Sequence, residues 1–256
     1  MKTKHSSPQK LATLLFLFGL LPFCVWGQAP DIEMVYVKGG TFTMGCTSEQ
    51  SDCYDDERPI HEVTLSDYYI GKYEITQAQY RAVMGKNPSE FSGCDNCPVE
   101  NVSWQDARQF CYKLSKLTGK NYTLPTEAQW EFAARGGTKS EGIFTYAGAF
   151  SLDEVGWYDD NSSDRTHRVG SKQANELGIY DMSGNVWEWC LDVYDSEYYA
   201  ESSSTDPTGP AGGGDSRVLR GGGWYNNPQF CRVARRGRDT PASTSDISGF
   251  RVVSFQ

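Results

Sequence analysis

The stretch that decides the fold runs from Asn175 to Trp189 and reads Asn-Glu-Leu-Gly-Ile-Tyr-Asp-Met-Ser-Gly-Asn-Val-Trp-Glu-Trp. Two glycines allow tight turns, and two tryptophans offer large surfaces for burial: Gly178, Gly184, Trp187 and Trp189. Three side chains of the same stretch carry oxygen atoms: Asp181, Asn185 and Glu188. The stretch therefore predicts an ordered turn, anchored by aromatic residues, on which oxygen ligands could converge.

A second block of motifs lies near the C-terminus. It comprises Arg217-Val-Leu-Arg-Gly-Gly-Gly-Trp224, the arginine-rich segment 232–238, Thr240-Pro241 and Gly249-Phe250-Arg251. Together, in this order, the two blocks resemble the formylglycine-generating enzyme family, also called the sulfatase-modifying factor family. The resemblance runs from about Met34 to Val253. It implies an α+β fold: a single formylglycine-generating-enzyme-type domain, C-type-lectin-like, low in regular secondary structure and with long ordered loops.

Short strands are expected in the N-terminal third. Residues 34–43 alternate apolar and polar side chains around a Gly-Gly pair, which predicts two strands and a turn. Residues 63–75 are again strand-like, with Tyr and β-branched side chains. Residues 48–58 read as an acidic loop, and the Ser, Gly and Pro cluster at 196–215 reads as an exposed one.

Three helices are expected to begin after Thr76, Ser103 and Thr126. Each of these residues is followed three positions later by Gln or Asp, a pattern that satisfies the free backbone N–H groups of a helix start. Gly119 is expected to end the second helix, and Gly136 with its neighbouring glycine the third.

Length and composition favour one domain. The chain has 256 residues, enough to bury a sizeable core, and its 26 Gly, 15 Tyr and 7 Trp indicate many loops anchored by aromatic rings. We therefore assign residues 28–256 to one domain.

The N-terminus has the pattern of a signal peptide. Three lysines flank the start of an apolar stretch from Leu11 to Trp26, and Gly27 offers a small residue at a cleavage point. We assign residues 1–27 to a signal peptide and expect an extracytoplasmic protein, periplasmic or secreted, with no membrane span after cleavage. The alternatives are an uncleaved membrane anchor and a lipoprotein modified at Cys24, although residues 21–23 lack the small side chains expected before a lipidated cysteine.

Charge excludes one class of partner. Residues 1–27 hold three lysines and no acid, so their removal changes the formal net charge from −9 to −12. Phosphate contacts need clustered cations, and we therefore expect no nucleic-acid partner. The arginines of segment 232–238 are expected to hold local carboxylates.

Seven cysteines would remain after cleavage, in a compartment that permits disulfides. Pairing them in order gives the bridges Cys46–Cys53, Cys94–Cys97 and Cys190–Cys231, and leaves Cys111 on a buried helix face. Zinc is an alternative for Cys94 and Cys97, but the chain has no second cysteine pair at suitable spacing.

Calcium is the cofactor that the first stretch suggests, because carboxylates and backbone carbonyls suit a hard cation. The family resemblance implies the ligands Asp181, Gly184, Val186 and Glu188. The alternative is a turn in which Asp181 and Glu188 accept hydrogen bonds from backbone donors and arginines. A second calcium site of the family has no clear match in residues 155–170.

A copper site is also implied by the resemblance, and here the sequence departs from the family. The family's oxidase holds copper(I) with two cysteines spaced Cys-x-x-x-x-Cys after a Gly-Gly-Ser motif, and converts a substrate cysteine to formylglycine. Counted from the Gly-Gly pair, Asn226 and Cys231 stand at the two cysteine positions here, and Gly223 replaces the Ser. Counted back from Thr240, Cys231 fits neither position. One thiolate makes a poor copper(I) site, and Cys231 is the one catalytic candidate.

Non-haem iron is a further alternative, because distant relatives in sulfoxide synthesis bind iron through histidines. Beyond residue 27 the chain has only His61 and His167. With Asp159, Asp160 or Asp164 they could form a facial triad. The simpler interpretation is that the two histidines are isolated from each other and bind no metal.

Three functions follow from these sites. The first is a non-catalytic binding or structural module of the cell envelope. Its groove, with Trp187, Tyr194 and Trp224, would hold an extended peptide, an envelope protein or a glycan, an expectation that rests on analogy with the fold. The second is a formylglycine-generating oxidase that acts on exported sulfatases, and the third is a non-haem metal oxygenase. The missing cysteine ranks the module first.

Overall fold

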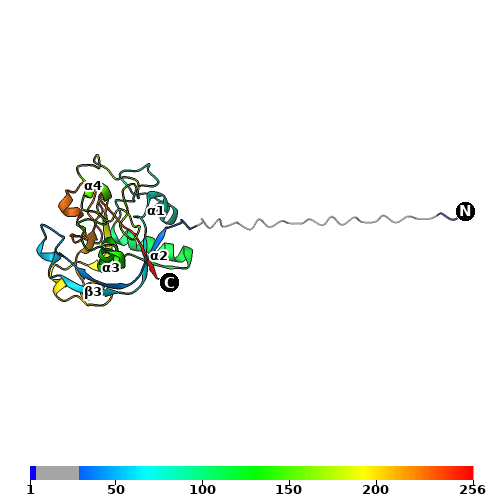
Figure 1. Ribbon diagram of the computed structural model, residues 1–256. Coiled ribbons are helices and arrows are strands. Elements are labelled where there is room, and N and C mark those ends of the chain that lie inside the picture. The colour runs from blue at the N-terminus through cyan, green and yellow to red at the C-terminus, as the bar shows by residue number, and fades with distance from the viewer. Residues whose placement is uncertain (4–28, 256) are drawn as a thin grey trace.

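A computed structural model describes residues 1–3 and 29–255 of the protein (Figure 1). The expected signal peptide, with Cys24 and the Leu11–Trp26 stretch, therefore lies almost entirely outside the described residues. Within the described part of the chain, no helix has both the length and the apolar content that a bilayer crossing requires.

Two four-stranded sheets and a hairpin form the β part of the domain. The first sheet has the order β1-β4-β10-β5 and is antiparallel throughout; its strands are β1 (Met34–Val37), β4 (Tyr68–Gly71), β10 (Val253–Phe255) and β5 (Asn121–Thr123). The hairpin pairs β2 (Gly40–Met44) with β3 (His61–Leu65). The two ends of the described domain thus meet in one sheet, as Figure 1 shows.

The second sheet carries both motif blocks. Its order is β8-β7-β6-β9, with β6 (Trp187–Val193), β7 (Arg217–Arg220), β8 (Arg236–Asp239) and β9 (Ser248–Gly249). The pair β6–β9 is parallel, and the other two pairs are antiparallel. Among the described residues, strand β8 has only β7 as a neighbour, so it forms one edge of the sheet.

All three predicted helix starts are confirmed. The helices are α1 (Gln77–Met84), α2 (Trp104–Thr118) and α3 (Glu127–Ala134), and each begins with a complete capping box, at Thr76, Ser103 and Thr126. Gly119 ends α2 in the left-handed conformation, as expected. A short helix α4 (Leu152–Val155) and four 3₁₀ turns complete the helical part: η1 (Asp55–Glu57), η2 (Gly137–Lys139), η3 (Tyr198–Ala200) and η4 (Pro228–Cys231).

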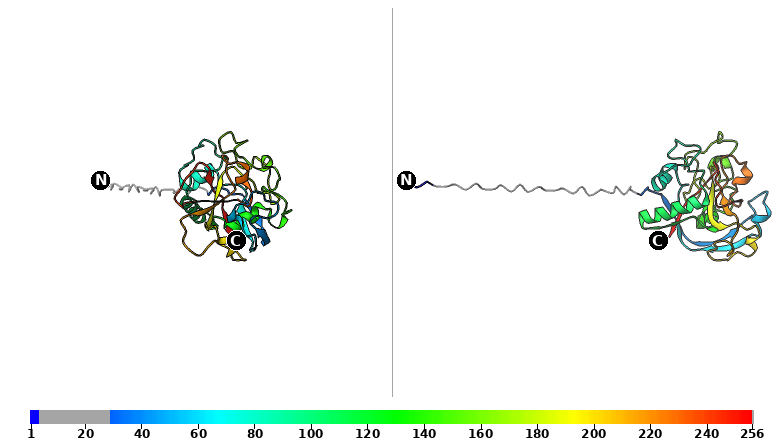
Figure 2. Two further views of the ribbon diagram at one scale, coloured as in Figure 1. Left: turned by 90° about the vertical axis from the view of Figure 1, so that its left-hand side faces the viewer. Right: turned by 180° about the vertical axis from the view of Figure 1, so that it is seen from behind.

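Helix α3 is almost wholly buried, and α2 lies along one side of the domain (Figure 2). Trp130 and Phe132 of α3 pack in a core cluster that also contains residues of β2, β3, β6 and β7. Acidic residues of α3 are neutralised inside the core, because Arg220 of β7 bonds both Glu127 and Glu131, at 3.0 Å to Glu127. The predicted α+β, loop-rich single domain is confirmed.

Candidate functional site

A groove of about 520 Å³ opens beside strand β8. Its lining comes from β6, β7, β8, η4 and the loops around residues 54–56 and 245–248. Alternate residues of a strand point to opposite faces. Both Gly237 and Arg238 line the groove, so it follows the open edge of β8 as well as one face of the sheet.

Trp187 forms part of the groove and lies directly against the backbone of β8. A Cβ atom at Gly237 would lie only 2.8 Å from Cζ3 of the Trp187 ring, so only glycine permits this approach. The Nε1 of Trp187 donates a hydrogen bond to Oδ1 of Asn226 at 2.7 Å, and the backbone N–H of Gly223 donates to the same oxygen at 2.9 Å. Asn226 therefore holds both the indole ring and the turn after β7.

Tyr194 lies on the same groove, as predicted. Its hydroxyl donates to Oδ2 of Asp56 at 2.7 Å, and the guanidinium groups of Arg236 and Arg238 lie 4.9 and 4.8 Å from its ring centre. Burial, followed by the hydrogen bond to Asp56, raises the pKa of Tyr194 to about 12. The phenol thus stays protonated and fixes the position of Asp56.

Trp224 does not line the groove, in contrast to the prediction. Its Nε1 donates to the carbonyl of Asp246 at 3.0 Å, and its ring packs edge-on against Phe91 at 5.3 Å. Of the three residues expected at a peptide groove, Trp187 and Tyr194 line this groove, whereas Trp224 supports the neighbouring loop.

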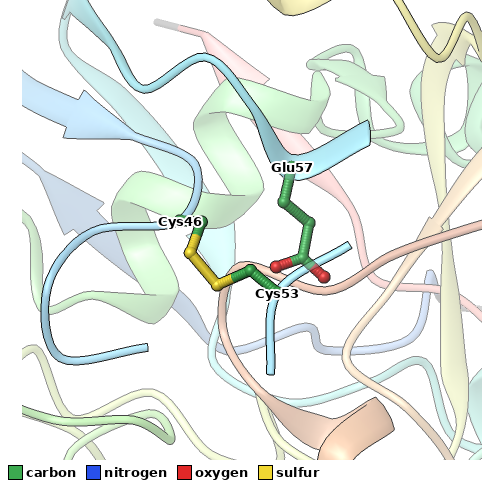
Figure 3. A group of neighbouring side chains, drawn as sticks. All are labelled: Cys46, Cys53 and Glu57. Atoms are coloured by element: carbon green, nitrogen blue, oxygen red, sulfur yellow. A yellow bond between two sulfur atoms is a disulfide. The ribbon is translucent and has the colours of Figure 1, made fainter. Parts of the chain in front are cut away.

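Another part of the groove wall comes from a loop that a disulfide closes. Cys46 and Cys53 are bonded, as predicted, and Tyr54 and Asp56 follow directly and line the groove. Figure 3 shows the carboxylate of Glu57 beside this disulfide. Both Glu57 oxygens accept hydrogen bonds from Arg232, at 2.9 and 2.7 Å.

The cysteine predictions are confirmed at two bridges and wrong at the third. Cys94 and Cys97 are bonded to each other, which leaves no thiolate there for zinc. Cys190 and Cys231 are free, so the expected bridge between them is absent. The reason is packing, because Cys190 lies in the apolar cluster around α3, whereas Cys231 packs with α4 and Tyr158.

Cys231 and Asn226 do not fit a copper(I) site. Cys231 is fully buried and does not line the groove, and burial raises the pKa of its thiol well above the ordinary value. Its Sγ lies 2.6 Å from the place that a Cβ of Gly222 would occupy, so the sulfur is covered by backbone. The side-chain oxygen of Asn226 already accepts two hydrogen bonds. Of the other free thiols, Cys111 lies in a third cluster.

The expected calcium ligands fall into two groups. Glu188 is bound by Arg251 through both oxygens, at 2.6 and 2.7 Å, and also accepts from Nε1 of Trp130 at 2.9 Å. Asp181 accepts one hydrogen bond, from the N–H of Gly170 at 2.7 Å, and its Oδ1 is buried with no partner among the described residues. Glu188 therefore has the arginine pairing of the alternative interpretation, while Asp181 keeps an oxygen that fits a cation.

Carboxylates outnumber cations around this turn. Glu74 accepts from the Asn185 amide at 2.6 Å and from the N–H of Val186 at 3.1 Å, close to Asp181 and Glu188. Burial raises the pKa of Asp181 to about 6, and burial with the charge of Asp181 raises the pKa of Glu74. Arg251 is the cation that lowers both values. Gly184 and Val186 lie in the turn that precedes β6, and Glu188 lies within β6.

The two histidines do not form a metal triad. His61 packs on the ring of Tyr199 at 4.7 Å, whereas His167 stacks on Trp157 at 3.8 Å. Among residues 1–3 and 29–255, the one group of three metal-ligand side chains within reach of each other is Cys46, Cys53 and Glu57. Its two sulfurs are bonded to each other, and Asp159, Asp160 and Asp164 belong to no such group.

Comparisons with known proteins agree with this architecture. Residues 27–255 match the family model described as sulfatase-modifying factor enzyme 1-like domain. The chaperone protein LppX of Paenibacillus barcinonensis is 36% identical over 86% of this chain and 89% of the relative. The formylglycine-generating enzyme of Streptomyces coelicolor is 32% identical over 85% and 87%. The inactive C-alpha-formylglycine-generating enzyme 2 of Bos taurus is 28% identical over 95% and 96%.

Two solved structures are similar over nearly the same range. Treponema denticola variable protein 1 has a TM-score of 0.78 and 33% identity, covering 86% of this chain and 94% of that one. PvdO from Pseudomonas aeruginosa has a TM-score of 0.79 and 28% identity, covering 88% and 95%.

Proposed function

Because this chain belongs to the sulfatase-modifying factor family, we propose that it is a non-catalytic binding module of the cell envelope whose groove takes an extended peptide. The observation that carries the proposal is that the residues at the two expected copper positions, Asn226 and Cys231, do not offer a pair of thiolates to the groove. Asn226 serves as a hydrogen-bond acceptor for Trp187, and Cys231 is buried away from the groove. The groove beside β8 is lined by aromatic side chains, of which Tyr54, Tyr194 and Phe230 are half-buried and Trp187 is buried.

The open edge of β8 supports a peptide ligand. An extended peptide can add a strand to a sheet edge, where its main chain pairs with free backbone groups and its side chains enter flanking pockets. Residues 235–239 line the groove without a break, and Trp187, Leu219 and Ile247 supply apolar contacts. A similar relative is named a chaperone protein and another is named inactive, and both names agree with binding in the absence of catalysis.

An extracytoplasmic location is part of the proposal. The signal-peptide pattern of residues 1–27 would direct export, and the disulfides Cys46–Cys53 and Cys94–Cys97 form most readily in an oxidising compartment. We also propose calcium, with Asp181 as the side-chain ligand, and propose no copper.

The test is an aldehyde assay on the purified mature chain. A Cys-x-Pro-x-Arg peptide is incubated with the protein, copper and oxygen, and the product is analysed by mass spectrometry for formylglycine. The formylglycine-generating enzyme of Streptomyces coelicolor serves as the positive control. We expect no aldehyde above a protein-free control. Aldehyde that disappears in Cys231→Ser would establish the oxidase instead and overturn the module.

A further inference from the structure

Arg235 differs from the two buried arginines beside it. Arg232 makes a two-bond pair with Glu57, and Arg236 makes one with Glu127, at 2.7 and 3.0 Å. The nearest carboxylate oxygens to Arg235, on Asp56 and Glu57, lie 3.8 Å away, which is beyond hydrogen-bond distance. Within the described residues, the Arg235 side chain donates no hydrogen bond, and its Nε is buried without a partner.

Aromatic rings hold Arg235 in place and leave its donors free. Its Cζ lies 3.7 Å from the ring centre of Tyr54 and 5.2 Å from that of Phe230. A guanidinium that stacks on rings uses its flat faces, while its N–H groups point outward in the plane. The side chain is 15% exposed and lines the groove, so its two terminal Nη groups, unlike the buried Nε, can reach a ligand there.

The acids near Arg235 are partly engaged. Glu57 is paired with Arg232, and Asp56 accepts from Tyr194 through Oδ2, whereas Oδ1 of Asp56 faces Arg235 at 3.8 Å. The other aspartate of the lining, Asp239, accepts the N–H of Thr240 through Oδ1 at 2.7 Å.

Arg238 adds a second cation to the groove. It is exposed, lies over the ring of Tyr194 and forms no salt bridge among the described residues. The lining therefore contains three arginines and two aspartates, in a chain where 33 acids outnumber 24 Lys and Arg. One of the three arginines, Arg236, is paired with the buried Glu127, so Arg235 and Arg238 are the cations left to a ligand.

We propose that the groove selects an acidic peptide, and that Arg235 donates two parallel hydrogen bonds to a carboxylate of that peptide with Arg238 as the second cation. This inference rests on the proposed function, since it names the ligand of the same groove. The guanidinium fork matches a carboxylate in two-bond geometry, and such charge-assisted bonds are about twice as strong as neutral ones. Arg235 loses little side-chain freedom on binding because Tyr54 and Phe230 already fix it.

A peptide is favoured over an acidic glycan by the backbone of the groove. Edge strand β8 offers main-chain pairing over residues 236–239, which a sugar chain cannot use in register. The apolar side chains beside it, Trp187, Leu219, Phe230 and Ile247, suit alternate side chains of an extended peptide.

The experiment compares four pools of octapeptides by fluorescence anisotropy with the purified mature chain. All share randomised Ser, Thr, Val, Ile and Tyr positions and an acetylated N-terminus. Three are amidated and carry Glu, Gln or Lys at one central position. The fourth carries the central Gln and a free C-terminal carboxylate, which separates side-chain from C-terminal recognition. We expect the Glu pool, or the fourth pool, to bind about tenfold more tightly than the amidated Gln pool, and the Lys pool to bind most weakly.

Three variants assign the preference to residues. Arg235→Gln is expected to lower binding of the acidic pool to the level of the amidated Gln pool measured with the same variant, and Arg238→Gln to reduce the preference. Arg165→Gln removes one exposed arginine outside the groove and is expected to change nothing. Circular dichroism checks that each variant is folded. If Arg235→Gln does not fold, the comparison of the peptide pools and the Arg238→Gln variant still test the acid preference.

The outcomes separate the inference from the proposed function. Equal binding of the Glu, Gln and free-acid pools, or tightest binding of the Lys pool, overturns acid selection and leaves a peptide-binding module. Binding of polygalacturonate that Arg235→Gln weakens, with no binding of any pool, overturns the peptide ligand. If neither the peptide pools nor polygalacturonate binds, both the acid selection and the proposed binding module are overturned.

Discussion

The indole N–H of Trp187 is bonded to the side-chain oxygen of Asn226 at 2.7 Å. This contact joins the first motif block to the second, and it engages the residue that, counted from the Gly-Gly pair, was expected at the first copper position. The hydrogen bond gives Asn226 a structural role in the groove, and the same contact leads to the first prediction.

Replacing Asn226 should loosen the groove. Asn226→Ala leaves the N–H groups of Trp187 and Gly223 without an acceptor, so we expect a loss of about 1–3 kcal/mol in the free energy of unfolding. Urea denaturation followed by tryptophan fluorescence measures it. Asn226→Asp keeps an oxygen acceptor and should lose less. Unchanged stability in the alanine variant would show that water replaces the amide.

Restoring a cysteine should not restore an oxidase. In Asn226→Cys the second thiol, Cys231, remains buried outside the groove, with a pKa raised by burial. We expect no formylglycine from the Cys-x-Pro-x-Arg peptide with added copper. Aldehyde production by this variant, and not by Asn226→Ser, would mean that Cys231 can reach the groove.

Three thiols should be free but unreactive in the mature chain. Cys111, Cys190 and Cys231 are each buried in a different apolar cluster, and burial raises all three thiol pKa values, that of Cys111 to about 12. A chromogenic disulfide reagent should therefore react with none in the native protein and with three in guanidinium. Peptide mapping without reduction provides the control, and a peptide joining Cys190 to Cys231 would contradict the structure.

Calcium should raise the melting temperature through Asp181. Its free oxygen lies among buried carboxylates, so a bound cation offsets their repulsion. Asp181→Asn should abolish the difference between calcium and chelator. Glu188→Gln is the contrasting variant, because it disturbs the pair with Arg251 and should destabilise the fold in both conditions. Equal melting temperatures for the unmutated protein with calcium and with chelator would rule the site out.

The pH dependence of stability should reveal Asp192. Burial, with the charge of Glu127 as a second cause, raises the pKa of Asp192 from 3.8 to about 8. The folded state then holds a proton that the unfolded chain releases, so this residue lowers stability as the pH rises from about 4 to about 8. Asp192→Asn stays neutral and can still accept the hydrogen bond from the N–H of Glu127.

Melting curves at pH 5 and pH 8 measure this effect. Asp192→Asn should gain stability relative to the unmutated protein mainly at pH 8, whereas Asp215→Asn, which changes an exposed aspartate, should show no such trend. An equal effect of Asp192→Asn at both pH values would contradict the assigned protonation.

Local signals in the sequence predicted the parts of the fold that depend on local contacts. The helix starts at Thr76, Ser103 and Thr126 were predictable because a capping box lies within four residues. The bridge between Cys46 and Cys53 was predictable because a short loop separates them. The strands of the second sheet were harder to recognise, since the motif stretch reads as a turn until its partners β7 and β9 are known.

The site could be predicted only in part, because its side chains are positioned by contacts between residues that are distant in sequence. The arginines of segment 232–238 were expected to hold carboxylates, which is correct for Arg232 and Arg236. Nothing in the segment indicates that Arg235 instead stacks on Tyr54, from the other end of the chain. The prediction of a bridge from Cys190 to Cys231 was wrong for the same reason. Both cysteines directly follow a motif, but that position in the sequence does not reveal the direction of either side chain.

The disulfide between Cys46 and Cys53 has a consequence for when the protein can act. Tyr54 and Asp56 stand one and three residues beyond it; Tyr54 stacks on Arg235, and Asp56 accepts the hydrogen bond of Tyr194. A chain still carrying reduced thiols would leave this segment tethered only by its noncovalent contacts, and ligand capture would weaken. Oxidation of this one pair would therefore order the groove wall, and reduction would relax it.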